Sequence, residues 1–254
     1  MRTINFSDIL YRAVTLCGFD RTAIQDSTFR MIRDFASQRV ARIWEQEPWP
    51  DIVRTYEATP ATDSEGVDCI NLSSDIGDVL QVYTLNPAVT ARAVPVAYYL
   101  DDDGTNRRII IMDATSPVWV EYRQPKPDLF GEGYSGNSNY SVGAQVYFDT
   151  GSNSGSYLPS TTSAPAGNFY TCISATTAGQ SPSSAAAKWS RVKIPYFCGE
   201  YLVRSVLSDY LRTESQFEAA ALAEEEAEQA KMLQVDRVLR SEGQVRRLNV
   251  INTY

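Results

Sequence analysis

The apolar positions near both ends of the chain recur every three or four residues, which is the period of an α-helix. In the last of these segments the repeated position is mostly alanine, and large apolar side chains are sparse. Gly18 follows the first segment, where a left-handed residue can end a helix. The pattern predicts four helices, at residues 5–17, 26–47, 196–212 and 214–242.

From residue 51 the apolar and polar positions alternate, which is the period of a β-strand. Short strands are predicted in this central region at 52–58, 68–72, 79–85, 92–100, 107–112 and 117–123. Asp102, Asp103, Gly104 and Asn106 lie between two of them and predict a hairpin turn. A calcium loop at Asp101–Asp103 is disfavoured because the rest of the ligand pattern is missing.

A glycine- and serine-rich stretch, 126–141, predicts a linker. After it, residues 142–194 alternate strand-like segments with polar loops, the strands being expected at 142–148, 168–175 and 189–194. We therefore expect an α+β fold: terminal helices that form a helical bundle, a central small β region and an inserted β-rich module. The expected domains are a core of 1–125 plus 195–254, the linker 126–141 and the inserted module 142–194.

The last predicted helix has few large apolar side chains, and its small side chains bury too little area to suit the core of an isolated subunit. We expect neighbouring copies or partner proteins to cover it. The residues after it form a tail that carries both arginines and apolar side chains: Arg246, Arg247, Leu248, Val250, Ile251 and Tyr254. This composition suits a segment that docks on a partner, and the alternative is an ordinary frayed terminus.

Composition excludes several classes of function. The chain has 254 residues, a formal net charge of −8 and no histidine. The negative net charge argues against a surface that binds nucleic acid. Without histidine, Ser-His-Asp and Cys-His catalysis and most zinc or iron sites are excluded. Since no nucleophile motif or phosphate loop is present either, we expect no enzyme, no catalytic or metal site and no cofactor.

The four cysteines are scattered, without a CxxC pair, and are expected to be reduced and buried. The apolar stretches are too short and interrupted for a transmembrane helix, and the start lacks the features of a signal peptide. We expect a protein made in a cytosol-like compartment.

The acidic residues of the last helix allow two interpretations. Glu224, Glu225, Glu226 and Glu228 fall in a run that contains no basic residue. The ordinary interpretation is a solvated helix face. The sharper hypothesis is that these carboxylates face a DNA channel and keep the duplex from adhering to its wall.

Residues 39–52, with the sequence RVARIWEQEPWPDI, resemble a segment of tailed-phage head-to-tail adaptor (connector) proteins. In these proteins an aromatic-rich helix runs into a Trp-Pro step and a small β region. The long last helix with its extended tail is also similar to those adaptors. The resemblance covers about the first fifty and the last sixty residues, counted on this sequence.

The resemblance implies a structural protein of the virion neck, made in the host cytoplasm. Its partners would be the portal protein, a downstream tail or stopper protein, and copies of itself in a ring, for which twelve is the expected number. The carboxyl-terminal tail would dock on the portal. DNA would pass through the channel without specific binding.

Residues 143–192 resemble the small β modules of carbohydrate-binding, chitin-binding-like type that phage structural proteins often carry. The resemblance implies exposed aromatics that stack on sugar rings, at Tyr147, Tyr170 and Trp189. An alternative function is therefore a carbohydrate-binding or adhesion protein. The competing interpretation is that these three rings form the core of a small module or contact other subunits, because so small a unit needs large apolar side chains.

Overall fold

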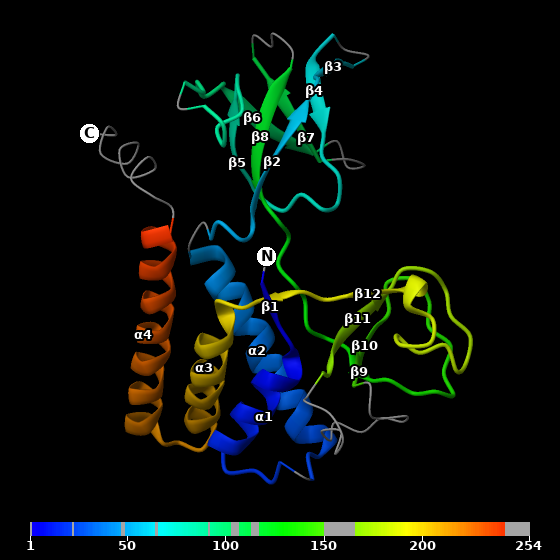
Figure 1. Ribbon diagram of the computed structural model, residues 1–254, viewed down its shortest axis with the longest axis vertical. Helices are drawn as coiled ribbons and strands as arrows, with labels where there is room; N and C mark the ends of the chain where they lie inside the picture. The colour runs from blue at the N-terminus through cyan, green and yellow to red at the C-terminus, as the bar shows by residue number, and fades with distance from the viewer. Residues whose placement is uncertain are drawn as a thin grey trace. The chain divides into compact units, whose positions relative to one another are not determined.

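The computed structural model describes residues 2–21, 23–46, 49–63, 66–90, 92–102, 107–112, 117–149 and 166–241, the last four by their backbone alone. The chain divides into two compact units (Figure 1). The first consists of Met1–Gln46 and Pro127–Tyr254, and the second of Glu47–Lys126.

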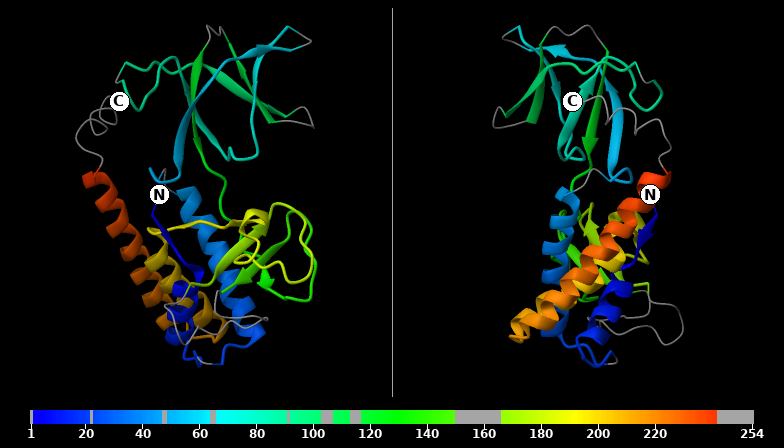
Figure 2. Two further views of the ribbon diagram at one scale, coloured as in Figure 1. Left: turned by 45° about the vertical axis from the view of Figure 1, so that its right-hand side comes forward. Right: turned by 90° about the vertical axis from the view of Figure 1, so that its left-hand side faces the viewer.

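The first unit contains the helices α1 (Phe6–Leu16), α2 (Asp26–Gln46), α3 (Cys198–Thr213) and α4 (Phe217–Ser241). These are the four helices that the apolar periodicity predicts. Helix α1 ends as expected: Gly18 has a φ of +79°, and the amides of Gly18 and Phe19 donate to the carbonyls of Thr15 and Val14. This paired arrangement satisfies carbonyls that the helix end would otherwise leave without donors. Helices α3 and α4 run antiparallel and side by side (Figures 1 and 2).

Two sheets complete the first unit. Strand β1 (Thr3–Ile4) pairs antiparallel with β13 (Ile194–Pro195), which brings the start of the chain beside the start of α3. A four-stranded sheet has the order β12 (Trp189–Arg191), β11 (Asn168–Cys172), β10 (Gln145–Phe148), β9 (Glu132–Gly133). Strand β9 is parallel to β10, and the other pairs are antiparallel. A 3₁₀ turn, η1 (Ala186–Lys188), precedes β12.

The second unit is built from two antiparallel sheets around one core. One sheet has the order β2 (Val53–Ala58), β8 (Val118–Arg123), β5 (Val79–Tyr83), and the other β3 (Ala61–Thr62), β4 (Asp68–Asn71), β7 (Arg107–Ile111), β6 (Tyr98–Asp102). Side chains from both sheets, among them Val82, Val120 and Ile109, are fully buried in a single cluster. Each strand expected here is present, although β6 begins six residues later than predicted, at Tyr98 rather than residue 92. Asp102 of β6 is paired with Arg107 of β7, which agrees with the expected hairpin. The turn residues Asp103, Gly104 and Asn106 lie outside the described residues.

The predicted fold class is wrong. The described residues contain thirteen strands in four sheets, and they contain no terminal helical bundle. The reason lies in the core of the first unit. Phe6 of α1 and Phe29 of α2 pack against Tyr147 of β10 and Phe169 of β11, with ring centroids 4.7 Å apart for Phe6 and Phe169 and 5.1 Å for Phe29 and Tyr147. The helices therefore bury their apolar faces against a sheet as well as against each other, and the fold is mixed, with helices and sheets sharing one core.

The same contacts place the domain boundaries differently from the sequence prediction. The strands of 142–194 share their core with α1 and α2, so they belong to the first unit, and the segment set apart from the helices is Glu47–Lys126. Most of the expected linker, 126–141, is also built into the first unit. It contributes β9, and buried Arg33 of α2 donates to the carbonyl oxygens of Phe130 and Gly131 at 3.1 and 3.2 Å.

Candidate functional site

Helix α4 is held to α3 by a narrow stripe of small side chains. Ala220, Ala223 and Ala227 are buried against it, and the hydroxyl of Ser208 in α3 donates to the carbonyl of Ala220 at 2.9 Å. Small residues let the two backbones approach closely but bury little apolar area. The stripe explains how a helix poor in large apolar residues packs within this unit.

The side of α4 that faces away from α3 carries large apolar side chains in solvent. Leu222 and Met232 are 65% and 59% exposed, and at 100° per residue both lie on the side opposite the alanine stripe. Leu233 is 52% exposed but lies nearer to α3, because it lines the cavity described below. Phe217 at the start of the helix is 69% exposed. Scattered exposed apolar residues are normal, but several on one 25-residue helix give it apolar area suited to contact with another protein.

A cluster of ion pairs fixes the inner side of α4. Arg39 of α2, which is 4% exposed, donates to both carboxylate oxygens of Asp209 in α3 at 2.6 and 2.7 Å. It also donates to both carboxylate oxygens of Glu224 in α4 at 2.6 and 2.7 Å. Burial opposes the charge on Arg39, but the bonds to the two carboxylates outweigh burial and raise its pKa. One guanidinium therefore joins three helices.

The predicted acidic channel face is divided by this arrangement. Glu224 and Glu228 turn inward: Glu224 pairs with Arg39 and Arg42, and Glu228 pairs with Arg42 and Lys231. Glu226 pairs with Arg204 at 2.6 Å. Exposed Glu225 accepts a hydrogen bond from Gln229. The structure does not bring the four carboxylates together on one free acidic face.

The three predicted sugar-stacking aromatics do not form an exposed platform. Tyr147 is 2% exposed within the Phe6–Phe29–Phe169 cluster. Trp189 is 6% exposed and packs edge-on against Tyr140, and its indole N–H donates to the carbonyl of Gln180. Tyr170 is partly buried. Two of the three rings therefore cannot stack on a sugar, because protein atoms cover their faces.

The predicted docking tail, with Arg246, Arg247, Leu248, Val250, Ile251 and Tyr254, lies outside the described residues. Within the part of the chain that the structure describes, no three His, Cys, Asp or Glu side chains gather as a metal site would require. All four cysteines are free and buried, and burial raises the pKa of Cys17 to about 12, so its thiol stays protonated.

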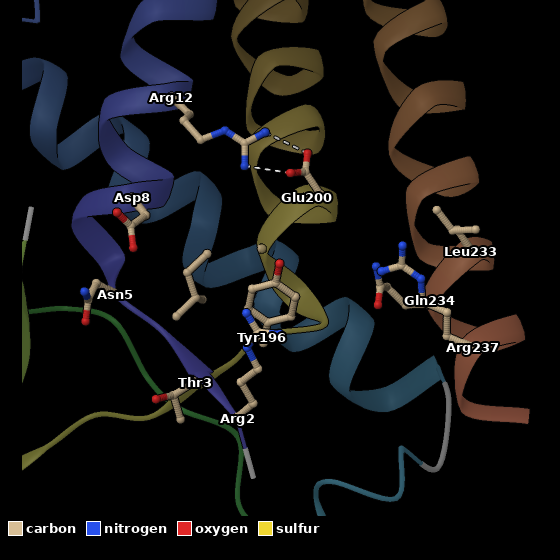
Figure 3. A pocket seen from close by; sticks show the side chains of 12 residues that line it. Arg2, Thr3, Asn5, Asp8, Arg12, Tyr196, Glu200, Leu233, Gln234 and Arg237 are labelled. Carbon is tan, nitrogen blue, oxygen red and sulfur yellow. Dashed lines mark hydrogen bonds and ion pairs between the residues drawn. The ribbon is translucent and has the colours of Figure 1, made fainter. Parts of the chain in front are cut away.

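A cavity of about 570 Å³ opens between β1, the first turns of α1 and α3, and the last part of α4 (Figure 3). Arg2, Asp8, Arg12, Tyr196, Glu200 and Arg237 provide the charged and aromatic part of its lining. Arg12 and Glu200 form a two-pronged ion pair with both N–O distances at 2.7 Å. The bonds from Arg12 lower the pKa of the Glu200 carboxyl.

Sequence reasoning missed both the Arg39 cluster and this cavity. In the sequence Arg39 is only one residue of the aromatic-rich stretch, and the charge run around Glu224 carries no sign of a partner in α2. Arg2 and Arg237 are separated by almost the whole chain, and only the β1–β13 pairing and the α3–α4 packing bring them to one cavity. No pattern in the sequence marks either site.

Comparison with known proteins gave no assignment: neither a family model nor a curated protein matches this chain. Among the described helices, none combines the length and the apolar character needed to cross a bilayer.

Proposed function

We propose that this chain is a structural protein of a tailed-phage virion, a head-to-tail adaptor that assembles as a ring between portal and tail and catalyses no reaction. The sequence resemblance in residues 39–52 and in the last helix with its tail leads to this proposal. The observation that carries it is the outward side of α4, where Leu222 and Met232 lie in solvent.

Residues 39–52, which resemble a segment of the phage adaptors, help to hold α4 in place. Arg39 and Arg42 fasten α4 by ion pairs to Glu224 and Glu228. A helix anchored this way on its inner side can present its outer side to neighbouring subunits without shifting. A ring repeats one such modest contact around a closed symmetry, so no single interface needs to be large.

In this proposal the tail, 244–254, docks on the portal, and a downstream tail or stopper protein binds the opposite side of the ring. The channel carries DNA without specific binding, which agrees with a net charge of −8. The alternative function, sugar binding by the 142–194 segment, has no observation in its favour, because Tyr147 and Trp189 are buried.

The proposal is tested by the mass and shape of the particles that the full chain forms, alone and with the portal protein of the same phage. Native mass spectrometry and negative-stain electron microscopy should find closed rings. The double variant Leu222→Glu with Met232→Glu should abolish assembly and leave the circular dichroism spectrum unchanged, since both side chains are already in solvent. Gln229→Glu is the control, because it adds charge to the same helix without removing apolar surface.

A chain truncated after Gly243 should lose portal binding. A protein that stays monomeric at every concentration and forms no complex with the portal would refute the adaptor function. Rings that form but bind the portal equally well without residues 244–254 would refute only the docking task of the tail.

A further inference from the structure

The cavity in Figure 3 holds more positive charge than its own carboxylates neutralise. The charge of Arg12 is paired with the carboxylate of Glu200. Arg2 and Arg237 also line the cavity, and neither has a carboxylate partner among the residues that the structure describes. Guanidinium groups without a partner beside a cavity are suited to hold an anion that the chain itself does not supply.

Arg2 is already fixed in position. Its guanidinium carbon lies 3.9 Å from the centroid of the Tyr196 ring, and its carbonyl accepts the amide of Tyr196 at 2.9 Å. A guanidinium stacked on an aromatic ring keeps its N–H donors at the edge of the plane, free for a planar bidentate acceptor. Because stacking restricts the side chain, binding would cost less conformational entropy than it would for a free arginine.

The first turn of α3 adds a second source of positive potential. Gly199 and Glu200 in this turn line the cavity, and the residue before the helix, Phe197, caps it with no side-chain hydrogen bond. The amino end of a helix carries a partial positive charge. Arg237 comes from the far side, from the last part of α4, so the positive groups stand on different walls of the cavity (Figure 3).

The remaining lining limits the size of the anion. Asp8 and Glu200 stand in the same cavity, and the chain has a net charge of −8. A nucleic acid brings many phosphates at close spacing and would meet this negative charge at every step. A single carboxylate needs only one or two arginines and is planar, as a bidentate guanidinium contact requires.

We propose that this cavity binds a carboxylate side chain from an acidic segment of a partner protein, with Arg2 and Arg237 as the groups that hold it. The inference goes beyond the adaptor function and does not depend on it, because it follows from the cavity of a single chain.

The test is isothermal titration calorimetry of the full chain with the peptide acetyl-Gly-Leu-Glu-Leu-Gly-amide, and with the same peptide carrying Gln in place of Glu. The acidic peptide should bind, and the Gln peptide should bind at least about tenfold more weakly, since it lacks the charge-assisted contact. Arg2→Gln and Arg237→Gln should each weaken binding by about fivefold or more. Arg21→Gln is the matched control, because Arg21 also stacks on a tyrosine, Tyr11, but lies outside the cavity.

Inorganic phosphate and a short DNA duplex are titrated in parallel. Equal binding of the Glu and Gln peptides, an equal loss in Arg21→Gln, or no binding of the acidic peptide would overturn the inference. Tighter binding of phosphate or DNA than of the acidic peptide would overturn the choice of ligand. Thermal unfolding of each variant establishes that it is folded, and ring assembly is scored separately, so failure here leaves the adaptor proposal standing.

Discussion

Arg39 and Glu224 are 185 residues apart in the sequence, and their side chains form a bidentate ion pair with N–O distances of 2.6 and 2.7 Å. The same guanidinium binds Asp209. Breaking a buried pair by removing one partner leaves an uncompensated charge. We expect Arg39→Ala to lower the free energy of unfolding by about 3–5 kcal/mol, measured by urea denaturation.

Arg39→Lys is the matched variant for this prediction. It keeps the charge but cannot form two planar bidentate contacts, so it should recover only part of the loss. If Arg39→Ala were as stable as the native chain, the ion-pair cluster would not hold α4 in place.

The pH dependence of stability should report on Glu224. Burial opposes its ionisation, but the hydrogen bonds and charge of Arg39 outweigh burial, so its pKa in the folded chain is lowered. The unfolded chain then takes up the proton first on acidification. The stabilisation from this carboxylate is complete above the ordinary glutamate pKa of 4.5 and is lost as the pH falls through the lowered folded value.

Urea midpoints measured from neutral pH down to acid should therefore fall less steeply in Glu224→Gln than in the native chain. Glu225→Gln, which changes an exposed carboxylate on the same helix, should keep the native slope. A Glu224→Gln slope equal to that of the native chain would contradict the prediction.

Gly167 lies against the ring of Tyr147. A Cβ atom at residue 167 would lie 2.6 Å from Cζ of Tyr147 and even closer to its hydroxyl oxygen. Tyr147 is packed between Phe6 and Phe29 and has no room to withdraw. We expect Gly167→Ala to destabilise the chain by about 1–3 kcal/mol through overpacking.

A double-mutant cycle checks this cause. Tyr147→Phe removes the atom nearest to the added methyl group, so the double variant should be more stable than the sum of the two single changes predicts. Simple additivity would show that the loss comes from the backbone at Gly167 and not from the contact.

Phe6 joins the helices of the first unit to the sheet of β10 and β11. Phe6→Ala should lower the free energy of unfolding by about 3–5 kcal/mol, because a large buried ring is removed. Hydrogen-exchange mass spectrometry should find protection reduced together in α2 and in β10–β11. Loss of protection confined to the helices would mean that the strands of 142–194 are an independent domain.

Ser215, between α3 and α4, has a φ of +59°, in the left-handed region that disfavours a residue with a Cβ. Ser215→Gly relieves this strain but makes the unfolded chain more flexible. We expect a net gain of about 0.5 kcal/mol in the free energy of unfolding.

Gly143 has a φ of +88°, a backbone conformation that is unfavourable for a residue with a Cβ atom. We expect Gly143→Ala to lower the free energy of unfolding by about 1 kcal/mol.

The local structure follows from the order of residues along the chain. The apolar period located all four helices within a few residues, and Gly18 marked the end of α1, because helix periodicity and end signals are set by neighbouring residues. Alternation located the strands of the central β region for the same reason. The two-residue strands β1, β3 and β9 carry no period and were not predicted.

Which elements share a core depends on contacts between residues far apart in the chain. The glycine-rich composition of 126–141 suggested a linker, yet Arg33 and β10 bind this segment into the first unit. The apolar rings of Phe6 and Phe169 are far apart in the sequence, and nothing local to either specifies the other. Likewise the partners of Glu224 and the cavity that holds Arg2 and Arg237 arise from long-range pairing, because electrostatic and packing contacts depend on distance in space and not on distance along the chain.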